Sequence, residues 1–166
     1  MDGALATLTS THARPGTVQW IGVRPARRVP VRRVGAAEIT LHGLADDRRE
    51  RPGKRAVTLI QWEHLAVIAA LVGRDEIDPA LLRRNVAIAG ANLLGLRKTR
   101  FRLGEAVLQG TGLCAPCSRM EDALGSGGYT AVRGHGGITA EVLEPGRISE
   151  GDLLAPVDAA IEGGRP

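Results

Sequence analysis

The feature that most constrains the fold is a series of short apolar runs separated by glycine, proline and charged turns. Such runs are typical of strands, and their close spacing leaves little room for a helix after each strand. The runs that we interpret as strands are residues 18–23, 37–42, 56–60, 86–88, 101–103, 106–109, 138–143 and 153–157. The pattern predicts a mainly β protein, a closed or partly open β-barrel with two or three short helices, and it argues against repeated βαβ units.

One segment changes from the strand period to the helical period. Its apolar residues fall on one helical stripe, and Gly73 follows where a C-terminal cap belongs. The stripe consists of Trp62, Leu65, Ala66, Ala69 and Ala70. Asp78 and Pro79 are typical of a helix start, which predicts a second, short helix over 79–83. Residues 118–124 are expected to add one or two helical turns.

The length of 166 residues suits one domain. We expect a loose N-terminal segment over 1–15, the domain over 16–158 and a tail over 159–166. No apolar run approaches the roughly 20 residues that a membrane-spanning helix needs. No basic and apolar leader is evident, and two cysteines are too few for a secreted disulfide scaffold. These features predict a cytoplasmic protein that is not bound to a membrane.

The basic residues are almost all arginine. The formal net charge is +4, and of the 22 basic residues only Lys54 and Lys98 are lysines. A coding bias would explain this, but arginine also forks onto the oxygens of phosphate or carboxylate, which favours an anionic small-molecule ligand. Nucleic acid is not expected, because the chain has only two Trp, one Tyr and one Phe, scattered along its length.

The two cysteines form a C-x-x-C pair, Cys114 and Cys117. A structural zinc site normally has four ligands, and the four histidines are not at ligand spacing with one another. A thioredoxin-type pair normally begins a helix in a βαβ context, which this sequence lacks. Zinc and a redox pair are therefore less favoured than two ordinary buried thiols, and one reactive thiol is favoured most. Cys117 is the better candidate for a reactive thiol, because Arg119 and a short helical segment follow it, and both would favour the thiolate, which is a nucleophile and a soft metal ligand.

Three arginine-bearing loops accompany the cysteines. They are residues 43–49 (GLADDRR), 83–86 (RRNV) and 133–137 (RGHGG). Each alone is explained equally well as a solvated loop or a helix end. Together with Cys117 they predict one anion-binding cleft to which Arg48, Arg84 and Arg119 contribute.

The order of these motifs along the chain resembles the MOSC family, from about residue 18 to residue 157. The matching positions are Gly43-Leu44 with Asp47-Arg48, Arg55 with Val57 and Leu59-Ile60, Glu63 with Leu65, Arg83-Arg84-Asn85 with Gly90, residues 104–111, Cys114 with Cys117, residues 134–142, and Gly151-Asp152. The first loop departs from the family's Gly-Asp-Arg-His, because Asp46-Asp47-Arg48-Arg49 stands there.

The resemblance implies a β-barrel that binds the molybdenum cofactor, a phosphorylated molybdopterin. The family includes the C-terminal domain of molybdenum-cofactor sulfurases and the mitochondrial amidoxime-reducing component, in which the family cysteine ligates molybdenum. By motif position, that residue is Cys117. The residues implied to bind the cofactor are Arg48, Arg55, Arg83, Arg84, Asn85 and Arg119.

Two functions follow from this resemblance. Cys117 would either carry sulfur as a persulfide or ligate molybdenum during reduction of N-hydroxylated substrates, with a redox or sulfur-donor protein as partner. Pyridoxal phosphate is not expected, because the chain lacks the sulfurase's aminotransferase-like part. The alternative is a non-catalytic β-barrel module that binds an anion or a protein and whose cysteines are inert.

Overall fold

The protein is a closed barrel of seven strands, seen in a computed structural model that describes residues 3–157. The barrel order is β11-β7-β8-β9-β5-β6-β1, and pairing of β1 with β11 closes the ring. Only β5 and β6 pair in parallel; the other barrel pairs are antiparallel. The barrel strands are β1 (Gly16–Val23), β5 (Val57–Gln61), β6 (Val86–Ala89), β7 (Arg100–Leu103), β8 (Ala106–Leu113), β9 (Ile138–Glu144) and β11 (Leu153–Pro156). The predicted β-barrel is confirmed.

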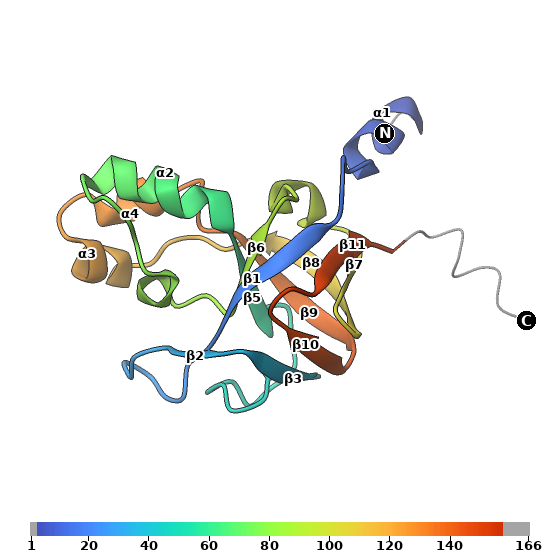
Figure 1. The fold of residues 1–166 in the computed structure, drawn as a ribbon, viewed down its shortest axis with the longest axis horizontal. Coiled ribbons are helices and arrows are strands. Elements are labelled where there is room, and N and C mark those ends of the chain that lie inside the picture. The colour runs from blue at the N-terminus through green and yellow to red at the C-terminus, as the bar shows by residue number, and fades with distance from the viewer. Residues whose placement is uncertain (1–2, 158–166) are drawn as a thin grey trace, which may run out of the picture.

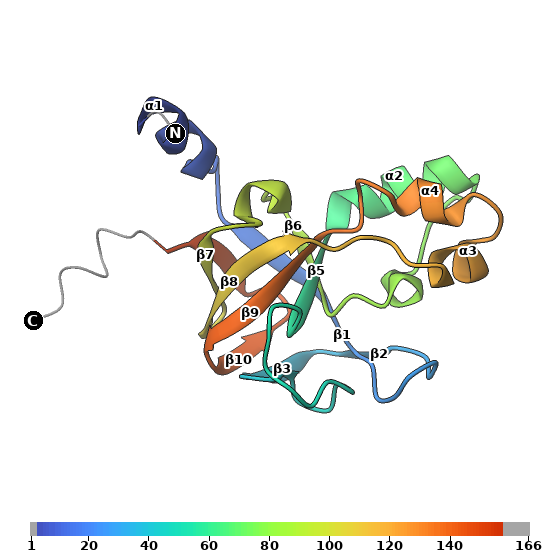
Figure 2. The ribbon, with the colours of Figure 1, turned by 180° about the vertical axis from the view of Figure 1, so that it is seen from behind.

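Four short strands of residues 3–157 lie outside the ring. β2 (Arg32–Val34) pairs with the end of β1, and a separate sheet has the order β10-β3-β4. The strands of that sheet are β3 (Ala36–Thr40), β4 (Gly43–Leu44) and β10 (Gly146–Ser149). In Figure 2 this small sheet lies beside the barrel and below it.

The helices divide between two sides of the barrel. α2 (Trp62–Val72), α3 (Arg119–Leu124) and α4 (Gly128–Val132) gather at one end, whereas α1 (Gly3–Ser10) projects from the other side (Figure 1). The 3-10 helix η1 (Pro79–Leu82) contacts α3, and η2 (Leu93–Leu96) contacts α1. The predicted helix signals are confirmed: Gly73 ends α2 with a left-handed φ of 73°, and the Asp78 carboxylate accepts a hydrogen bond of 2.9 Å from the Ala80 amide at the start of η1.

Two apolar clusters explain this arrangement. Successive strand residues point to opposite faces, so Val57 and Leu59 of β5 pack inside the barrel while Ile60 packs outside it. Ile60 joins the layer between the barrel wall and the helices, together with Leu82 of η1 and Met120 of α3. Strands β5 and β6 are therefore buried on both faces, and they form the wall from which the loops of the site extend.

Several expectations need correction. Trp62, Ala66 and Ala70 of the predicted stripe are exposed, and α2 instead buries Leu65, Ile68 and Ala69. Ile68 is buried in preference to Ala66 and Ala70, because burying its branched chain removes more apolar surface from water than burying an alanine does. The segment predicted to be loose contains α1, none of whose residues is buried. Helix α4 and strand β10 have no counterpart in the predicted elements, so the described residues contain four α-helices rather than two or three.

The predicted tail over 159–166 lies outside the described residues. Among residues 3–157, no helix has both the length and the apolar character needed to cross a membrane.

Candidate functional site

Arg83 connects the helical end of the protein to the β1–β2 loop. It caps η1 in a left-handed conformation with a φ of 56°. Its Nη1 donates a hydrogen bond of 2.6 Å to the carbonyl of Val29, and its Nη2 donates one of 3.3 Å to the carbonyl of Ala26. Arg83 therefore fixes a loop that carries two further arginines, Arg27 and Arg28.

Arg84 joins the cysteine loop (residues 114–117) to the glycine loop (residues 133–137). It is 7% exposed, and its guanidinium donates 2.9 Å and 3.5 Å hydrogen bonds to the carbonyls of Gly136 and Ala115. A third bond of 2.8 Å reaches the carbonyl of Leu82. Burial lowers the pKa of Arg84, and the thiols of Cys114 and Cys117 act in the opposite direction. We interpret Arg84 as a positioning residue, because three backbone carbonyls occupy its donors and its charge lies near both sulfurs.

Asn85 is fully buried and is held on all sides. Its Oδ1 accepts hydrogen bonds of 3.1 Å and 3.2 Å from the amide and the hydroxyl of Thr58. Its Nδ2 donates to the carbonyl of Gly22 at 3.2 Å and to Oδ1 of Asp47 at 3.4 Å. These contacts tie β6 to β5, β1 and the loop after β4, so Asn85 contributes to the frame of the site.

The Asp47 carboxylate anchors the loop after β4 through an ion pair with Arg24. The Arg24 Nη2 lies 2.8 Å from Oδ2 of Asp47, and the Arg24 amide donates to Oδ1 at 2.7 Å. The Asp47 side chain is completely buried. Burial would raise the pKa of this carboxyl, but the hydrogen bonds and charge of Arg24, with a further hydrogen bond from Asn85, hold its pKa below the ordinary value. The Asp-Asp-Arg-Arg loop thus has a defined structural role despite its departure from the family pattern.

The two cysteines differ sharply in exposure. Cys114 is 3% exposed, and its amide donates a hydrogen bond of 2.8 Å to the carbonyl of Gly137. Cys117 is exposed, and one residue, Ser118, separates it from the start of α3 in the chain. A side chain at position 136 would collide with the carbonyl of Cys114, so glycine is needed for the close approach of the two loops.

Two hollows are lined in part by the residues that neighbour Cys117 in the chain. The thiol pocket, of about 600 Å³, is lined by Leu113, Cys114, Ala115, Pro116, Thr130, Arg133, Gly134, Gly136 and Gly137. The arginine groove, of about 660 Å³, is lined by Arg27, Arg28, Leu81, Arg83, Ser118, Arg119, Asp122 and Ala123. Pro116, which precedes the exposed Cys117 in the chain, lines the thiol pocket, and Ser118, which follows it, lines the arginine groove.

Several of the arginines that were predicted to bind the cofactor lie close together in the structure. Burial lowers the pKa of Arg83, and the charges of Arg119, Arg24 and Arg48 lower it further, against the opposing charge of Asp47. Arg119 also lines the arginine groove. Arg48 and Arg55 are exposed and line neither hollow, and Arg55 acts electrostatically on Arg84 rather than on Arg83.

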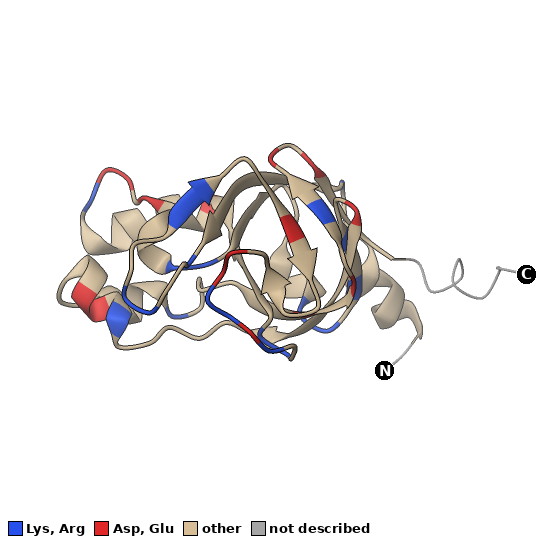
Figure 3. Ribbon diagram, turned by 90° about the horizontal axis from the view of Figure 1, so that it is seen from below, with Lys and Arg blue, Asp and Glu red and all other residues tan. Residues whose placement is uncertain are grey.

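Sequence reasoning missed Arg27 and Arg28 as site residues. Their signal is the run of residues 24–33, which holds five arginines. Figure 3 shows why charge alone does not locate the groove, because Lys and Arg occur over the barrel as well as at its helical end. The hydrogen bonds from Arg83 to the carbonyls of Ala26 and Val29 are what identify the β1–β2 loop as part of the site.

A histidine pair lies where α2 meets the glycine loop. The rings of His64 and His135 are 5.1 Å apart in a T-shaped arrangement, and Nδ1 of His135 is the one buried side-chain N or O atom without a hydrogen-bond partner among residues 3–157. Burial lowers the pKa of His64, the neighbouring His135 lowers it further, and the charge of Glu63 opposes both.

We predict that His64 makes the free energy of unfolding depend on pH. The pKa of His64 is lower in the folded chain than in the unfolded chain, where it is about 6.5. The contribution of His64 to the free energy of unfolding is therefore complete above pH 6.5, and it is lost as the pH falls through 6.5 toward the pKa of the folded chain. Urea unfolding between neutral and mildly acidic pH measures the effect. The loss should be smaller in His64→Gln, and an identical pH dependence of the two proteins would contradict the prediction.

Comparison with known proteins agrees with the fold. The YuaD protein from Bacillus subtilis superimposes with a TM-score of 0.75 at 19% identity, covering 85% of this chain and 94% of that one. YiiM from Geobacillus stearothermophilus gives a TM-score of 0.73 at 18% identity, covering 87% of this chain and 76% of that one. YiiM from Escherichia coli gives 0.65 at 21% identity, covering 86% and 70%. These likenesses concern the fold alone.

No curated protein matches the sequence. The decisive comparison is with protein families, in which residues 25–155 match the MOSC domain. The matched segment contains the arginine groove, the thiol pocket and both cysteines, together with all strands of the barrel except β1 and the last residue of β11. This chain belongs to the MOSC domain family.

Proposed function

We propose that the protein binds the molybdenum cofactor, with the Cys117 thiolate as the molybdenum ligand and the arginine groove as the site of the cofactor's anionic end. The observation that supports this most is that Cys117, the one exposed thiol of residues 3–157, follows Pro116 of the thiol pocket and precedes Ser118 of the arginine groove in the chain. Family membership supports the choice of ligand.

The donor chemistry of the site fits such a ligand. A soft thiolate suits a soft metal, and guanidinium groups suit phosphate oxygens. Within the described part of the chain, Arg27, Arg28 and Arg119 have no hydrogen-bond or ion-pair partner, so their donors are free. The remaining anion in the groove, Asp122, does not neutralise four arginines.

The chain's own residues would act mainly by positioning. Arg84 holds Ala115 and Gly136, and so keeps the cysteine loop against the glycine loop. The bound cofactor would supply redox chemistry for reduction of an N–O bond, with electrons from a redox protein.

Sulfur carriage is the second function that we propose for the same site. The Cys117 thiolate would attack the outer sulfur of a donor protein's persulfide, forming a new S–S bond at Cys117 while the donor leaves as its thiolate. This version uses the exposure of Cys117 and does not need Cys114.

Alkylation tests the proposal directly. In the cofactor-free chain, iodoacetamide should modify Cys117 and leave the buried Cys114 largely unmodified in the folded protein. Prior incubation with the molybdenum cofactor should protect Cys117, and peptide mass spectrometry reads both sites. An added sulfur atom on Cys117 after exposure to a persulfide donor would favour sulfur carriage. Alkylation of Cys117 that the cofactor does not slow would contradict cofactor binding through this thiol.

A further inference from the structure

The arginine groove carries more positive charge than one phosphate group can match. Its lining holds four arginines and one aspartate, Asp122. A phosphate monoester carries about −1.5 to −2 charges near pH 7, so one such group leaves part of the excess unmatched. A second phosphate group adds at least one further negative charge and several acceptor oxygens.

The groove is built from three separate segments rather than from one flexible arginine run. Arg27 and Arg28 come from the β1–β2 loop, Arg83 from the end of η1, and Arg119 from the first residue of α3. Arg83 cross-links the first two segments through its bonds to the carbonyls of Ala26 and Val29. Arg28 and Arg83 both have positive φ angles, of 65° and 56°. A positive φ is energetically unfavourable for residues other than glycine, and such strained residues are concentrated at functional sites.

We propose that the arginine groove recognises a diphosphate group of a small-molecule ligand. Arg28 would donate to the phosphate oxygens from the β1–β2 loop and Arg119 from the start of α3, while Arg83 would hold the loop that carries Arg28. The volume of about 660 Å³ leaves room for more than one phosphate group. The inference rests on the proposed function only for the other half of the ligand, which would extend from the groove toward Cys117.

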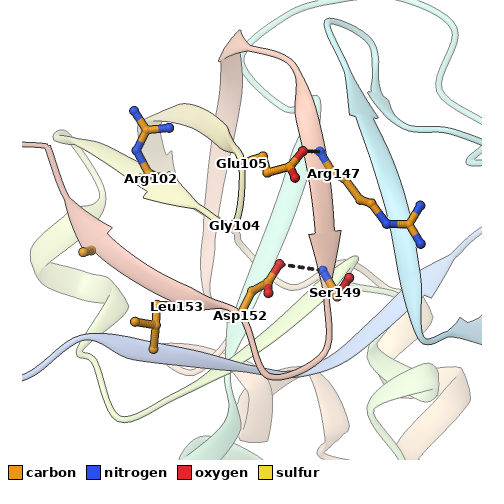
Figure 4. Close-up of a pocket in the computed structure, with 8 residues that line it drawn as sticks. Arg102, Gly104, Glu105, Arg147, Ser149, Asp152 and Leu153 are labelled. Atoms are coloured by element: carbon orange, nitrogen blue, oxygen red, sulfur yellow. Dashed lines mark hydrogen bonds between the residues drawn. The ribbon is translucent and has the colours of Figure 1, made fainter.

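A second groove in the same chain provides a matched control. It has a volume of about 620 Å³ and also contains two arginines, Arg102 and Arg147, but its lining includes the carboxylates of Glu105 and Asp152. Figure 4 shows these carboxylates accepting hydrogen bonds from the amides of Arg147 and Ser149. Because its formal charges balance, this groove should not select a diphosphate.

Titration calorimetry of the full chain with inorganic pyrophosphate and with orthophosphate tests the inference. We expect pyrophosphate to bind about tenfold more tightly or better, and Arg28→Gln or Arg119→Gln each to weaken it by about tenfold, the size of one charge-assisted hydrogen bond. Arg102→Gln in the control groove should leave the affinity unchanged. Thermal unfolding of each variant verifies that it is folded.

Three results would overturn the inference. They are equal affinity for the two anions, an equal loss in Arg102→Gln, and a nucleic-acid duplex that binds more tightly than pyrophosphate through Arg119. The titration uses neither molybdenum nor the thiol, so its failure is distinguishable from failure of the proposed function. Pyrophosphate selectivity without cofactor protection of Cys117 would leave the groove assigned and the proposed function wrong.

Discussion

Cys117→Ser is expected to abolish retention of molybdenum, or formation of the persulfide, whereas Cys114→Ser is expected to keep a substantial part. Cys117 is exposed next to the arginine groove, but Cys114 is 3% exposed and tied to the glycine loop through its amide. Serine replaces a soft thiolate by a hydroxyl that is neutral near pH 7 and a poorer ligand for a soft metal. The measurement is bound molybdenum, or persulfide by mass spectrometry, in the two variants.

The two variants control for one another, because both remove one sulfur from the same loop. A similar unfolding midpoint in the two proteins shows that any difference in metal content comes from the lost ligand. Equal loss of metal in both would replace the single ligand by a dithiol mechanism. No loss in either would make both cysteines inert and favour a non-catalytic module.

Asp47→Asn is expected to lower the free energy of unfolding by about 3 kcal/mol, the usual cost of removing one partner from a buried ion pair. The substitution leaves Arg24, whose side chain is 13% exposed, without its counter-ion. It also replaces one acceptor oxygen by a donor close to Nδ2 of Asn85. Guanidinium unfolding of the variant and the wild type measures the difference.

The exposed ion pair between Arg33 and Glu150 is the control. Its side chains are 61% and 30% exposed, so Glu150→Gln should barely change the unfolding midpoint. A loss of stability in Asp47→Asn as small as that in Glu150→Gln would show that the pair of Arg24 and Asp47 does not anchor the loop.

Asp47 also makes the free energy of unfolding depend on pH. Because its pKa is lower in the folded chain than in the unfolded chain, its contribution to the free energy of unfolding is present above about pH 4 and is lost as the pH falls toward the pKa of the folded chain.

The fold could be predicted because its signals are local. Apolar runs separated by turn residues predict β7 and β8, and Gly73 predicts the end of α2 from its own neighbourhood. The buried face of α2 could not be predicted in the same way. That face depends on what covers the helix, and α4, which contacts it, was itself not predicted.

The sequence predicts which loops form the site, but it does not predict the role of each residue in them. Arg84 and Asn85 were expected to contact a ligand, yet their partners include the carbonyl of Gly136, 52 positions away, and Thr58, 27 positions away. Such partners are set by the closure of the barrel, which a local pattern does not encode. Arg27 and Arg28 were overlooked for the same reason, because only the contact from Arg83 places their loop beside α3.

The central claim, that this MOSC protein holds the molybdenum cofactor through Cys117, is tested most directly by metal and pterin analysis of the protein purified from its own host. The account predicts molybdenum and pterin in equal amounts and in stoichiometric proportion to the chain. Folded protein that carries neither molybdenum nor pterin would contradict it.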